Sequence, residues 1–445
     1  MISDASAPKV APGFGNKPMR KAIPTGADEC FVYVTLPGET EAVTAGRYVR
    51  ETNRQGVTTG RFVYGRSYLA RPDAVEIDPA ELKLGARTYE TVLMKGLFGA
   101  LRDAGPDYWG RRVIEKHAGR TELGELDYLL HSPDDRAGAL GFGLGQAPPA
   151  PVRTFNPTLD LARLQEIADR LVNDEPRATD TEAAQVEELL LLGTSMGGAR
   201  PKAVVEDADG LWLAKFNRAD DKWNMARVEH AMLLLARACG LVTATSRIDT
   251  IGDRDVLLVK RFDREKVAKG YMRARMVSAL TLLRADEAQR ERWSYVVLAE
   301  ELRRISAEPR RDAAELFRRM LFNALISNID DHPRNHAVIA PQREWRLSPA
   351  YDLTPSVPVS TDRRDLAMAA GDLGRWANAR NLLSQAPRFL LDPAEASAMV
   401  DAMEGAVKGG WFPIARGAGV SEADCATIAN AFAYPGFRLQ SPEGL

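Results

Sequence analysis

The sequence predicts an α+β protein, with strands in the first 260 residues and helices in most of the rest. Short runs rich in β-branched and aromatic residues, bounded by Gly, Pro, Asp or Asn, have the character of strands. After about Tyr271 the apolar residues recur at helical spacing instead. Blocks of one pattern followed by the other are typical of α+β architecture. The expected strands lie at 30–36, 60–64, 211–216, 246–251 and 256–259.

Length and composition agree with a folded protein of several domains. The chain has 445 residues, a formal net charge of −2 and a pI near 6.3, so its overall charge does not indicate a nucleic-acid-binding protein. Cys30, Cys239 and Cys425 are far apart, which favours a reducing compartment over a disulfide framework. No apolar run approaches the roughly 18 residues of a membrane span. A cytoplasmic location without membrane association is therefore expected.

Shifts in composition suggest four segments. Residues 1–27 are rich in Pro, Gly, Ala and Lys without periodicity, which predicts a disordered leader. Residues 28–150 should form a first α+β domain, closed by a Pro-rich linker at 146–151. A β-rich unit with a glycine-rich loop is expected over 151–270, and a helical unit over 271–445.

Three polar residues in the helical unit have the spacing of a phosphoryl-transfer site. Asn335 follows Asp330 by five positions, and Asp352 follows seventeen positions later. An apolar face over 311–327 predicts a helix that delivers Asp330, and Pro333 places the next residues on a loop. A hairpin over 336–347 should return Asp352 towards Asn335. In this order the three side chains suit a proton acceptor and two Mg²⁺ ligands.

A second set of residues suits the binding of phosphates. The glycine-rich loop at 193–202 would let backbone N–H groups approach phosphate oxygens, although paired glycines also form ordinary turns. Lys215 shares one face of its strand with leucines. Glu229 lies on or beside the apolar stripe of a helix predicted over 223–239, where an ion pair with Lys215 would satisfy both charges. A solvated Glu229 at the edge of the stripe is the alternative.

Together these elements predict a protein-kinase-like two-lobed fold, in which 151–270 is the small lobe and 271–445 the mostly helical C-terminal lobe. Loop, lysine strand, helix, hairpin and connector follow in the order of a kinase small lobe. Two other interpretations remain. Asp330, Asp331, His332 and His336 could bind a transition metal, as in a metallohydrolase. Individual Asp and Asn residues could also be simple caps or turn formers.

Four motifs, in the same order, resemble the HipA family of serine/threonine kinases, the toxins of bacterial HipBA toxin–antitoxin modules. These are Ser-Met-Gly-Gly-Ala-Arg-Pro-Lys at 195–202, Val-Lys-Arg-Phe-Asp-Arg at 259–264, Asn-Ile-Asp-Asp-His-Pro-Arg-Asn at 328–335 and Leu-Ser-Pro-Ala-Tyr-Asp-Leu-Thr-Pro at 347–355. Segments 107–112 and 138–142 resemble the family's N-terminal domain. The likeness covers nearly the whole chain after the leader.

The resemblance implies roles at individual positions. Asp330 matches the catalytic base, Asn335 and Asp352 the Mg²⁺ ligands, and Lys215 the lysine on the ATP phosphates. Ser195 matches the serine at which family members autophosphorylate and become inactive. The other residues expected around ATP form the loop, the hinge and the phosphate end of the site: Gly197, Gly198, Ala199, Arg200, Pro201, Lys202, Lys260, Arg261, Phe262, His332, Pro333, Arg334 and Tyr351.

The resemblance also implies partners. Family toxins phosphorylate an aminoacyl-tRNA synthetase or another translation protein, and a HipB-like, DNA-binding antitoxin silences them, so contact with DNA would be indirect. Asp331 departs from the Gly that often follows the catalytic Asp, and its charge could alter metal or substrate preference.

Two other functions stay open. One is a small-molecule phosphotransferase of the aminoglycoside or choline kinase type. The other is an inactive nucleotide-binding regulator that acts in complex with an antitoxin.

Overall fold

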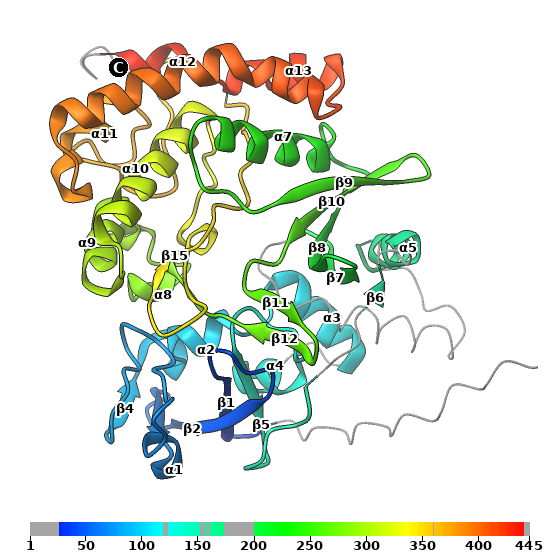
Figure 1. Cartoon of the computed structure of the whole chain (residues 1–445), viewed down its shortest axis with the longest axis vertical. Coiled ribbons are helices and arrows are strands. Elements are labelled where there is room, and N and C mark those ends of the chain that lie inside the picture. Colours follow the sequence, from blue (N-terminus) through cyan, green and yellow to red (C-terminus); the bar gives the residue numbers. More distant parts are fainter. Residues whose placement is uncertain are drawn as a thin grey trace, which may run out of the picture.

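The fold is α+β, with a protein-kinase-like pair of lobes and an additional N-terminal unit (Figure 1). The computed structural model describes residues 26–118, 123–151, 156–157, 161–172, 200–358 and 360–439. Most of the predicted leader therefore lies outside the described residues, as do Ser195, Gly197, Gly198 and Ala199. No helix in the described part of the chain is long and apolar enough to cross a membrane.

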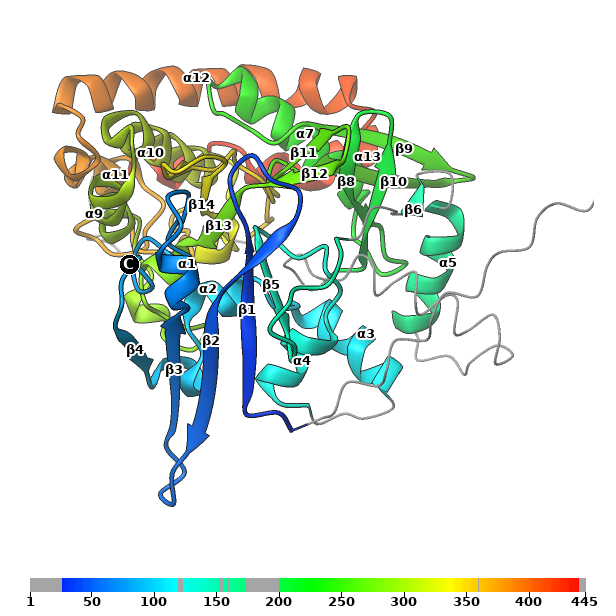
Figure 2. The ribbon, with the colours of Figure 1, turned by 60° about the horizontal axis from the view of Figure 1, so that its bottom comes forward.

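The N-terminal unit is built on an antiparallel five-stranded sheet in the order β4-β3-β2-β1-β5, which Figure 2 shows from the side of the long β2–β3 hairpin. The strands are β1 (Glu29–Thr35), β2 (Ala42–Thr52), β3 (Thr58–Tyr64), β4 (Thr88–Thr91) and β5 (Leu140–Gly143). Short helices connect them: α1 (Arg66–Leu69), η1 (Leu93–Gly96), α2 (Gly99–Asp103), α3 (Tyr108–Ala118) and α4 (Glu125–His131). The predicted strands at 30–36 and 60–64 are confirmed as β1 and β3.

The small lobe carries a second five-stranded sheet in the order β6-β7-β8-β10-β9. Its elements are β6 (Asn156–Pro157), α5 (Leu161–Val172), β7 (Lys202–Asp207), β8 (Gly210–Phe216), α7 (Met225–Ala238), β9 (Ser246–Ile251) and β10 (Arg254–Lys260). Side chains from α5 and α3 cover one face of β8 through Trp212 and Ala214, while α7 packs on β10 through Leu257. Burial on both faces explains the nearly continuous apolar sequence of β8 and β10.

Helix α7 begins and ends at recognisable residues. The side chain of Asn224 accepts a hydrogen bond from Arg227 N at 3.1 Å, which satisfies a free N–H of the first turn. Gly240 follows the helix with φ +84°, a conformation that only glycine adopts without cost. The helix predicted over 223–239 is confirmed within two residues.

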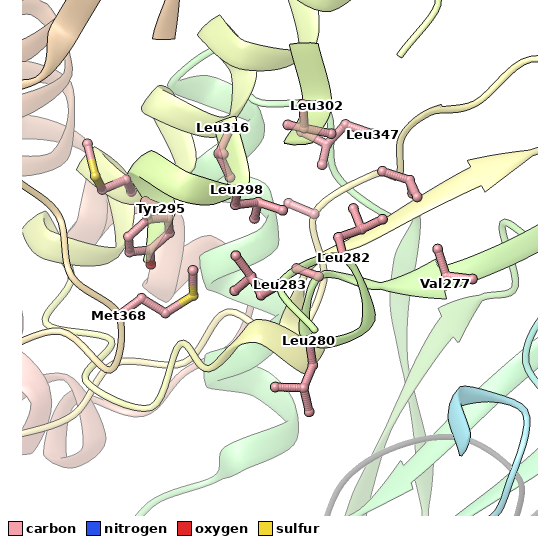
Figure 3. Packing of buried hydrophobic residues seen from close by; sticks show 14 of the residues in the cluster. Val277, Leu280, Leu282, Leu283, Tyr295, Leu298, Leu302, Leu316, Leu347 and Met368 are labelled. Atoms are coloured by element: carbon pink, nitrogen blue, oxygen red, sulfur yellow. The ribbon is translucent and has the colours of Figure 1, made fainter. Parts of the chain in front are cut away.

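The C-terminal lobe is built around the buried helix α10 (Pro309–Leu325), with α12 (Pro393–Gly417) lying across both α10 and α7 (Figure 1). Figure 3 shows Leu298 and Leu302 of α9 (Tyr295–Ile305) packed near Leu316 of α10. The remaining elements of this lobe are short: α8 (Ala279–Leu282), η3 (Arg290–Arg292), η4 (Pro333–Asn335), α11 (Ala379–Ser384), η5 (Ala386–Phe389), α13 (Glu422–Ile428), η6 (Ala429–Ala431) and η7 (Pro435–Arg438).

The C-terminal lobe has more strands than the sequence indicated. Strands β14 (Ala337–Ala340) and β15 (Arg346–Leu347) form the hairpin predicted over 336–347. The hairpin of β11 (Arg264–Val267) and β12 (Gly270–Arg273) was not expected, and neither was β13 (Arg275–Ser278), which pairs with β14. The described residues between 353 and 378 form no helix. Strands of four residues carry only a weak sequence signal, and β13 also depends on a partner that is distant in the chain.

The N-terminal unit shares a core with the rest of the chain. Apolar residues of its sheet, such as Val32 and Phe62, belong to one continuous buried cluster with residues of α7 and α10, such as Met232 and Phe317. The division into units at 28–150, 151–270 and 271–445 remains a proposal, supported by the two separate sheets but crossed by this cluster.

A buried charge network fixes the connection after β10 to the N-terminal unit. Asp263 accepts hydrogen bonds from Arg261 and Arg264, each at 2.8 Å, and from Gly138 N at 2.9 Å. Arg261 also donates to the carbonyl groups of Asp135 and Arg136. Burial alone would raise the pKa of Asp263, but the two guanidinium groups outweigh it and hold the pKa well below its usual range.

We predict that Asp263→Asn lowers the free energy of unfolding by about 3 kcal/mol at neutral pH, because two buried guanidinium groups lose a charged partner. The folded-state pKa lies below the unfolded value of about 3.9, so the stabilisation is complete above that value and is lost as the pH falls through the folded-state pKa. Urea unfolding should show a constant difference between wild type and variant above about pH 5 and a shrinking one below about pH 4.

The exposed residue Asp209 provides a control. Asp209→Asn should change stability by less than about 0.5 kcal/mol. A difference for Asp263→Asn that did not depend on pH would contradict the assignment of the carboxylate as the stabilising species.

Candidate active site

Lys215 lies at the point where the two lobes meet. Its Nζ is 2.6 Å from Oε1 of Glu229 on α7 and 2.8 Å from Oδ1 of Asp352 in the C-terminal lobe. The position on β8 follows from strand alternation, which sets Lys215 on the same face as Leu213. Glu229 is the partner predicted from the sequence, and Asp352 is a second partner that the sequence did not indicate.

The electrostatics of this trio follow from two carboxylates around one ammonium. Burial lowers the pKa of Lys215, but Asp352 and Glu229 outweigh it, so the net pKa is raised and the lysine stays charged. Burial would raise the pKa of Asp352, yet Lys215 lowers it to about 2. Burial raises the pKa of Glu229 against the opposing effect of Lys215. Asp352 is therefore the more firmly ionised of the two carboxyl groups.

Helix α10 positions the loop that carries Asp330. Ser327, with φ +54°, turns the chain out of the helix, and its Oγ donates to Ala431 O at 2.6 Å. Asn328 N donates to Asn323 O at 2.8 Å, which fixes the first loop residue to the helix end. As predicted from Pro333, the helix does not continue through the motif, and a single 3₁₀ turn, η4, spans Pro333–Asn335.

The side chain of Asp330 is exposed, while Asn335 is buried. Partial desolvation raises the pKa of Asp330; His332 opposes this rise and Asp352 adds to it. Asn335 Nδ2 donates to the carbonyl oxygen of Asp330 at 3.3 Å, so its Oδ1 is the atom left to act as a ligand. A carboxyl group with a raised pKa is better suited to accept a proton near neutral pH.

The predicted metal ligands suit Mg²⁺. Asn335 and Asp352 both line one cleft, and each offers an oxygen atom, the donor type that Mg²⁺ prefers. Asp352 has φ +58°, an uncommon backbone conformation for a residue other than glycine, and one often retained for function. Among the described residues no group of three or more His, Cys, Asp or Glu side chains could hold a metal ion.

The cleft between the lobes has a volume of about 780 Å³. Leu213, Val259 and Phe262 give it an apolar wall, and the ring centroid of Phe262 lies 5.6 Å from that of Tyr351. Lys215, Asp352 and Asn335 line its polar end. A planar base against the apolar wall and phosphates at the polar end would match these two surfaces.

The hinge residues differ in what they can offer a ligand. Lys260 N and Arg261 N already donate to the carbonyl groups of Thr245 and Leu211. The Arg261 side chain belongs to the network around Asp263. Within the described part of the chain, Phe262 N makes no hydrogen bond, so it is the hinge N–H best placed to serve a base.

Two predicted loop residues have protein partners. Arg200 forms a bidentate ion pair with Asp221, at 2.9 and 2.6 Å. Lys202 is buried at the start of β7, with Nζ 2.9 Å from Oδ2 of Asp107. These contacts anchor the end of the glycine-rich segment to the small lobe and to the N-terminal unit. Pro201 lies buried between them.

The remaining predicted residues surround Asn335. Arg334 pairs with Glu287, with Nη2 2.6 Å from Oε1, and its backbone oxygen accepts a hydrogen bond from Tyr351 at 2.8 Å. His332 lines the cleft, and Pro333 is buried. The guanidinium group of Arg334 is therefore paired with a carboxylate of the protein, and it also lies 3.6 Å from Asp103 of the N-terminal unit.

None of the predicted site residues lies in the N-terminal unit, yet that unit forms one wall of the cleft. Met94, Lys95, Arg102, Asp103 and Asp107 all line it. Asp103 accepts hydrogen bonds from Ser278 N and Oγ at 2.7 and 2.8 Å, which docks α2 on the C-terminal lobe. Asp107 opens the segment 107–112, and that motif was the one sequence signal that could have marked this wall.

Comparisons with known proteins agree with this architecture. Residues 194–411 match the HipA-like C-terminal domain. The curated protein named "Putative kinase Y4mE" from Sinorhizobium fredii is 28% identical over 333 residues, which are 70% of this chain and 75% of that protein.

Among solved structures, a chain of the Shewanella oneidensis MR-1 complex of HipA, HipB and operator DNA has a TM-score of 0.63 at 15% identity, covering 90% of this chain and 94% of that one. The Helicobacter pylori proinflammatory kinase CtkA has a TM-score of only 0.34 at 14% identity, over 50% of this chain and 93% of its own, and supports no conclusion.

The fold and the cleft define a kinase-like protein with an added N-terminal α+β unit. Nearly half of this chain, residues 194–411, therefore carries the HipA-like C-terminal domain.

We predict that Lys202→Met and Asp107→Asn each lower the free energy of unfolding by about 3–5 kcal/mol, because each leaves a buried group without its charged partner. The double variant should be more stable than the sum of the two losses implies, by at least about 1 kcal/mol. Denaturant unfolding of the four proteins measures this coupling. Losses that add within about 0.5 kcal/mol would show that the pair does not act as a unit.

Proposed function

We propose that this protein is an ATP-dependent serine/threonine protein kinase and the toxin component of a type II toxin–antitoxin system. One observation carries the proposal: Lys215 lies between Glu229 of the small lobe and Asp352 of the C-terminal lobe. Lys215, Asp352 and Asn335 all line the same cleft. Phosphoryl transfer relies on positioning and charge compensation more than on covalent chemistry of the protein. Lys215, Glu229 and Asp352 would supply both the positioning and the charge compensation.

Each residue has a definite part in the proposed reaction. Asp330 accepts the proton of the acceptor Ser or Thr hydroxyl group and orients its oxygen towards the γ-phosphate of ATP. Lys215 places a positive charge beside the phosphates, and Glu229 keeps that ammonium oriented. Asn335 and Asp352 would hold Mg²⁺, which would compensate the negative charge of the phosphates. The apolar wall with Phe262 and Tyr351 receives the adenine.

The resemblance to HipA toxins suggests how this protein would be regulated and which partners it would bind. We infer that Ser195, in the glycine-rich segment, is the site at which the kinase phosphorylates and inactivates itself. The Shewanella structure contains HipA, HipB and operator DNA. By analogy, a HipB-like antitoxin would hold this protein and link it to DNA, and the acceptor would be a translation protein such as an aminoacyl-tRNA synthetase.

We predict that Asp330→Gln lowers the rate of γ-phosphate incorporation by at least about 100-fold, because the acceptor hydroxyl loses its proton acceptor. Nucleotide affinity should change by less than about threefold, since Asp330 is assigned to the acceptor and not to ATP. Radiolabelled ATP measures the first quantity, and calorimetric titration the second.

The exposed residue Asp362 of the same lobe offers a matched control, and Asp362→Gln should retain wild-type transfer. If the Asp330→Gln protein still incorporated γ-phosphate at a comparable rate, the assignment of the base would be wrong.

We predict that wild-type protein incubated with Mg-ATP gains one phosphate on Ser195, because this serine matches the position at which HipA-family kinases phosphorylate themselves. Mass spectrometry of intact protein and of proteolytic peptides would detect and locate it. Ser195→Ala and Asp330→Gln should each lack the modified peptide. ATP binding without any modification would favour a nucleotide-binding regulator instead.

A further inference from the structure

Two adjacent aspartates of the proposed catalytic loop differ in their exposure to solvent. The side chain of Asp330 is exposed, whereas Asp331 is 1% exposed. The proposed function uses only the first. A buried carboxyl group beside the reacting one needs a compensating set of partners, because an unpaired buried charge is strongly destabilising.

Asp331 has those partners. Its Oδ2 accepts a hydrogen bond from the hydroxyl group of Tyr295 and another from Nε2 of His336, the latter at 2.8 Å. Because a carboxylate only accepts, Nε2 carries the proton of this imidazole. Burial raises the pKa of Tyr295 well above its usual value, so the phenol stays protonated and remains a donor.

The two donor residues, Tyr295 and His336, are themselves held by backbone hydrogen bonds and ring packing. Tyr295 is fully buried at the start of α9, where Ser294 caps the helix, and Tyr295 N donates to Ala369 O at 3.0 Å. Figure 3 shows its ring among the apolar side chains of the lobe. His336 adjoins β14, and its carbonyl oxygen accepts a hydrogen bond from Ala279 N at 2.8 Å. The two rings pack edge to face, with centroids 5.6 Å apart.

The contact between Asp331 and His336 closes the catalytic loop on itself. Residue 331 follows the proposed base, and residue 336 follows the proposed metal ligand Asn335. Within the closed segment, His332 N donates to Asp330 O at 2.8 Å, and Asn335 N donates to His332 O at 2.9 Å. The side-chain contact therefore fixes the separation between Asp330 and Asn335 from inside the lobe.

We propose that Asp331 is a positioning residue, which holds Asp330 and Asn335 in register through hydrogen bonds to Tyr295 and His336. This inference rests on the proposed kinase function. It differs from the expectation that the additional charge of Asp331 acts on the metal or the substrate, because the carboxyl group is turned into the core.

Tyr295→Phe tests the proposal, because it removes one hydroxyl group and keeps the ring. Tyr434→Phe is the matched control, since Tyr434 is also buried in this lobe and its hydroxyl group donates to Ala377 O at 2.8 Å. We expect Tyr295→Phe to reduce the maximal rate of self-phosphorylation by about 10-fold to 100-fold, with the ATP concentration for half-maximal rate unchanged. Tyr434→Phe should leave both quantities unchanged.

Hydrogen–deuterium exchange gives a readout that does not depend on activity. Peptides covering 329–336 should exchange at least about threefold faster in Tyr295→Phe than in Tyr434→Phe, because the loop opens more often when its anchor is weakened. Equal exchange in the two variants would overturn the positioning role. A wild-type protein that transferred no phosphate would refute the proposed function alone, and the exchange result would still decide the role of Asp331.

A pair of substitutions at Asp331 separates hydrogen bonding from charge. Asp331→Asn keeps an acceptor oxygen, while Asp331→Ala removes it. The positioning role predicts transfer by the Asn variant within about tenfold of wild type and well above that of the Ala variant. Equal loss in both would indicate that the negative charge itself is required, and would overturn the proposal.

Discussion

The contact on which the site depends is the ammonium group of Lys215 between two carboxylates from different lobes. The two carboxylates keep Lys215 charged, and Lys215 in turn favours the ionised form of each carboxyl group. The contact therefore requires α7 to turn Glu229 inward, β8 to present Lys215 on its leucine face, and the C-terminal loop to bring Asp352 across the cleft. The left-handed backbone of Asp352 shows that the loop adopts an uncommon conformation to do so.

The N-terminal unit also helps to position the site. It shares a hydrophobic cluster with the C-terminal lobe, and it supplies Asp107 to Lys202 and Asp103 to Ser278. These contacts are buried and polar, so they specify orientation as well as adding stability. The unit thus fixes both the end of the glycine-rich segment at Lys202 and one wall of the cleft.

Much of the fold could be predicted because its signals are local. The strands β1, β3, β8, β9 and β10 and the helices α7 and α10 have clear periodicity and end at capping or turn residues. Strands β11 and β13 escaped prediction because four residues carry too little pattern, and β13 pairs with a strand that is distant in the chain. The spacing of Asp330, Asn335 and Asp352 indicated a phosphoryl-transfer site, but not the wall formed by the N-terminal unit.

The sequence by itself determined the elements and the chemical types at the site: a lysine on a strand, an acidic residue on a helix stripe, and two carboxylates and an amide at fixed spacing. Only the tertiary structure decided which charges meet. Lys202 forms an ion pair with Asp107, and Arg200 forms one with Asp221. Asp331 is buried and accepts a hydrogen bond from Tyr295. The physical reason is that ion pairs and hydrogen bonds depend on distances of a few ångströms between residues far apart in the chain, whereas periodicity reports only which face of one element is buried.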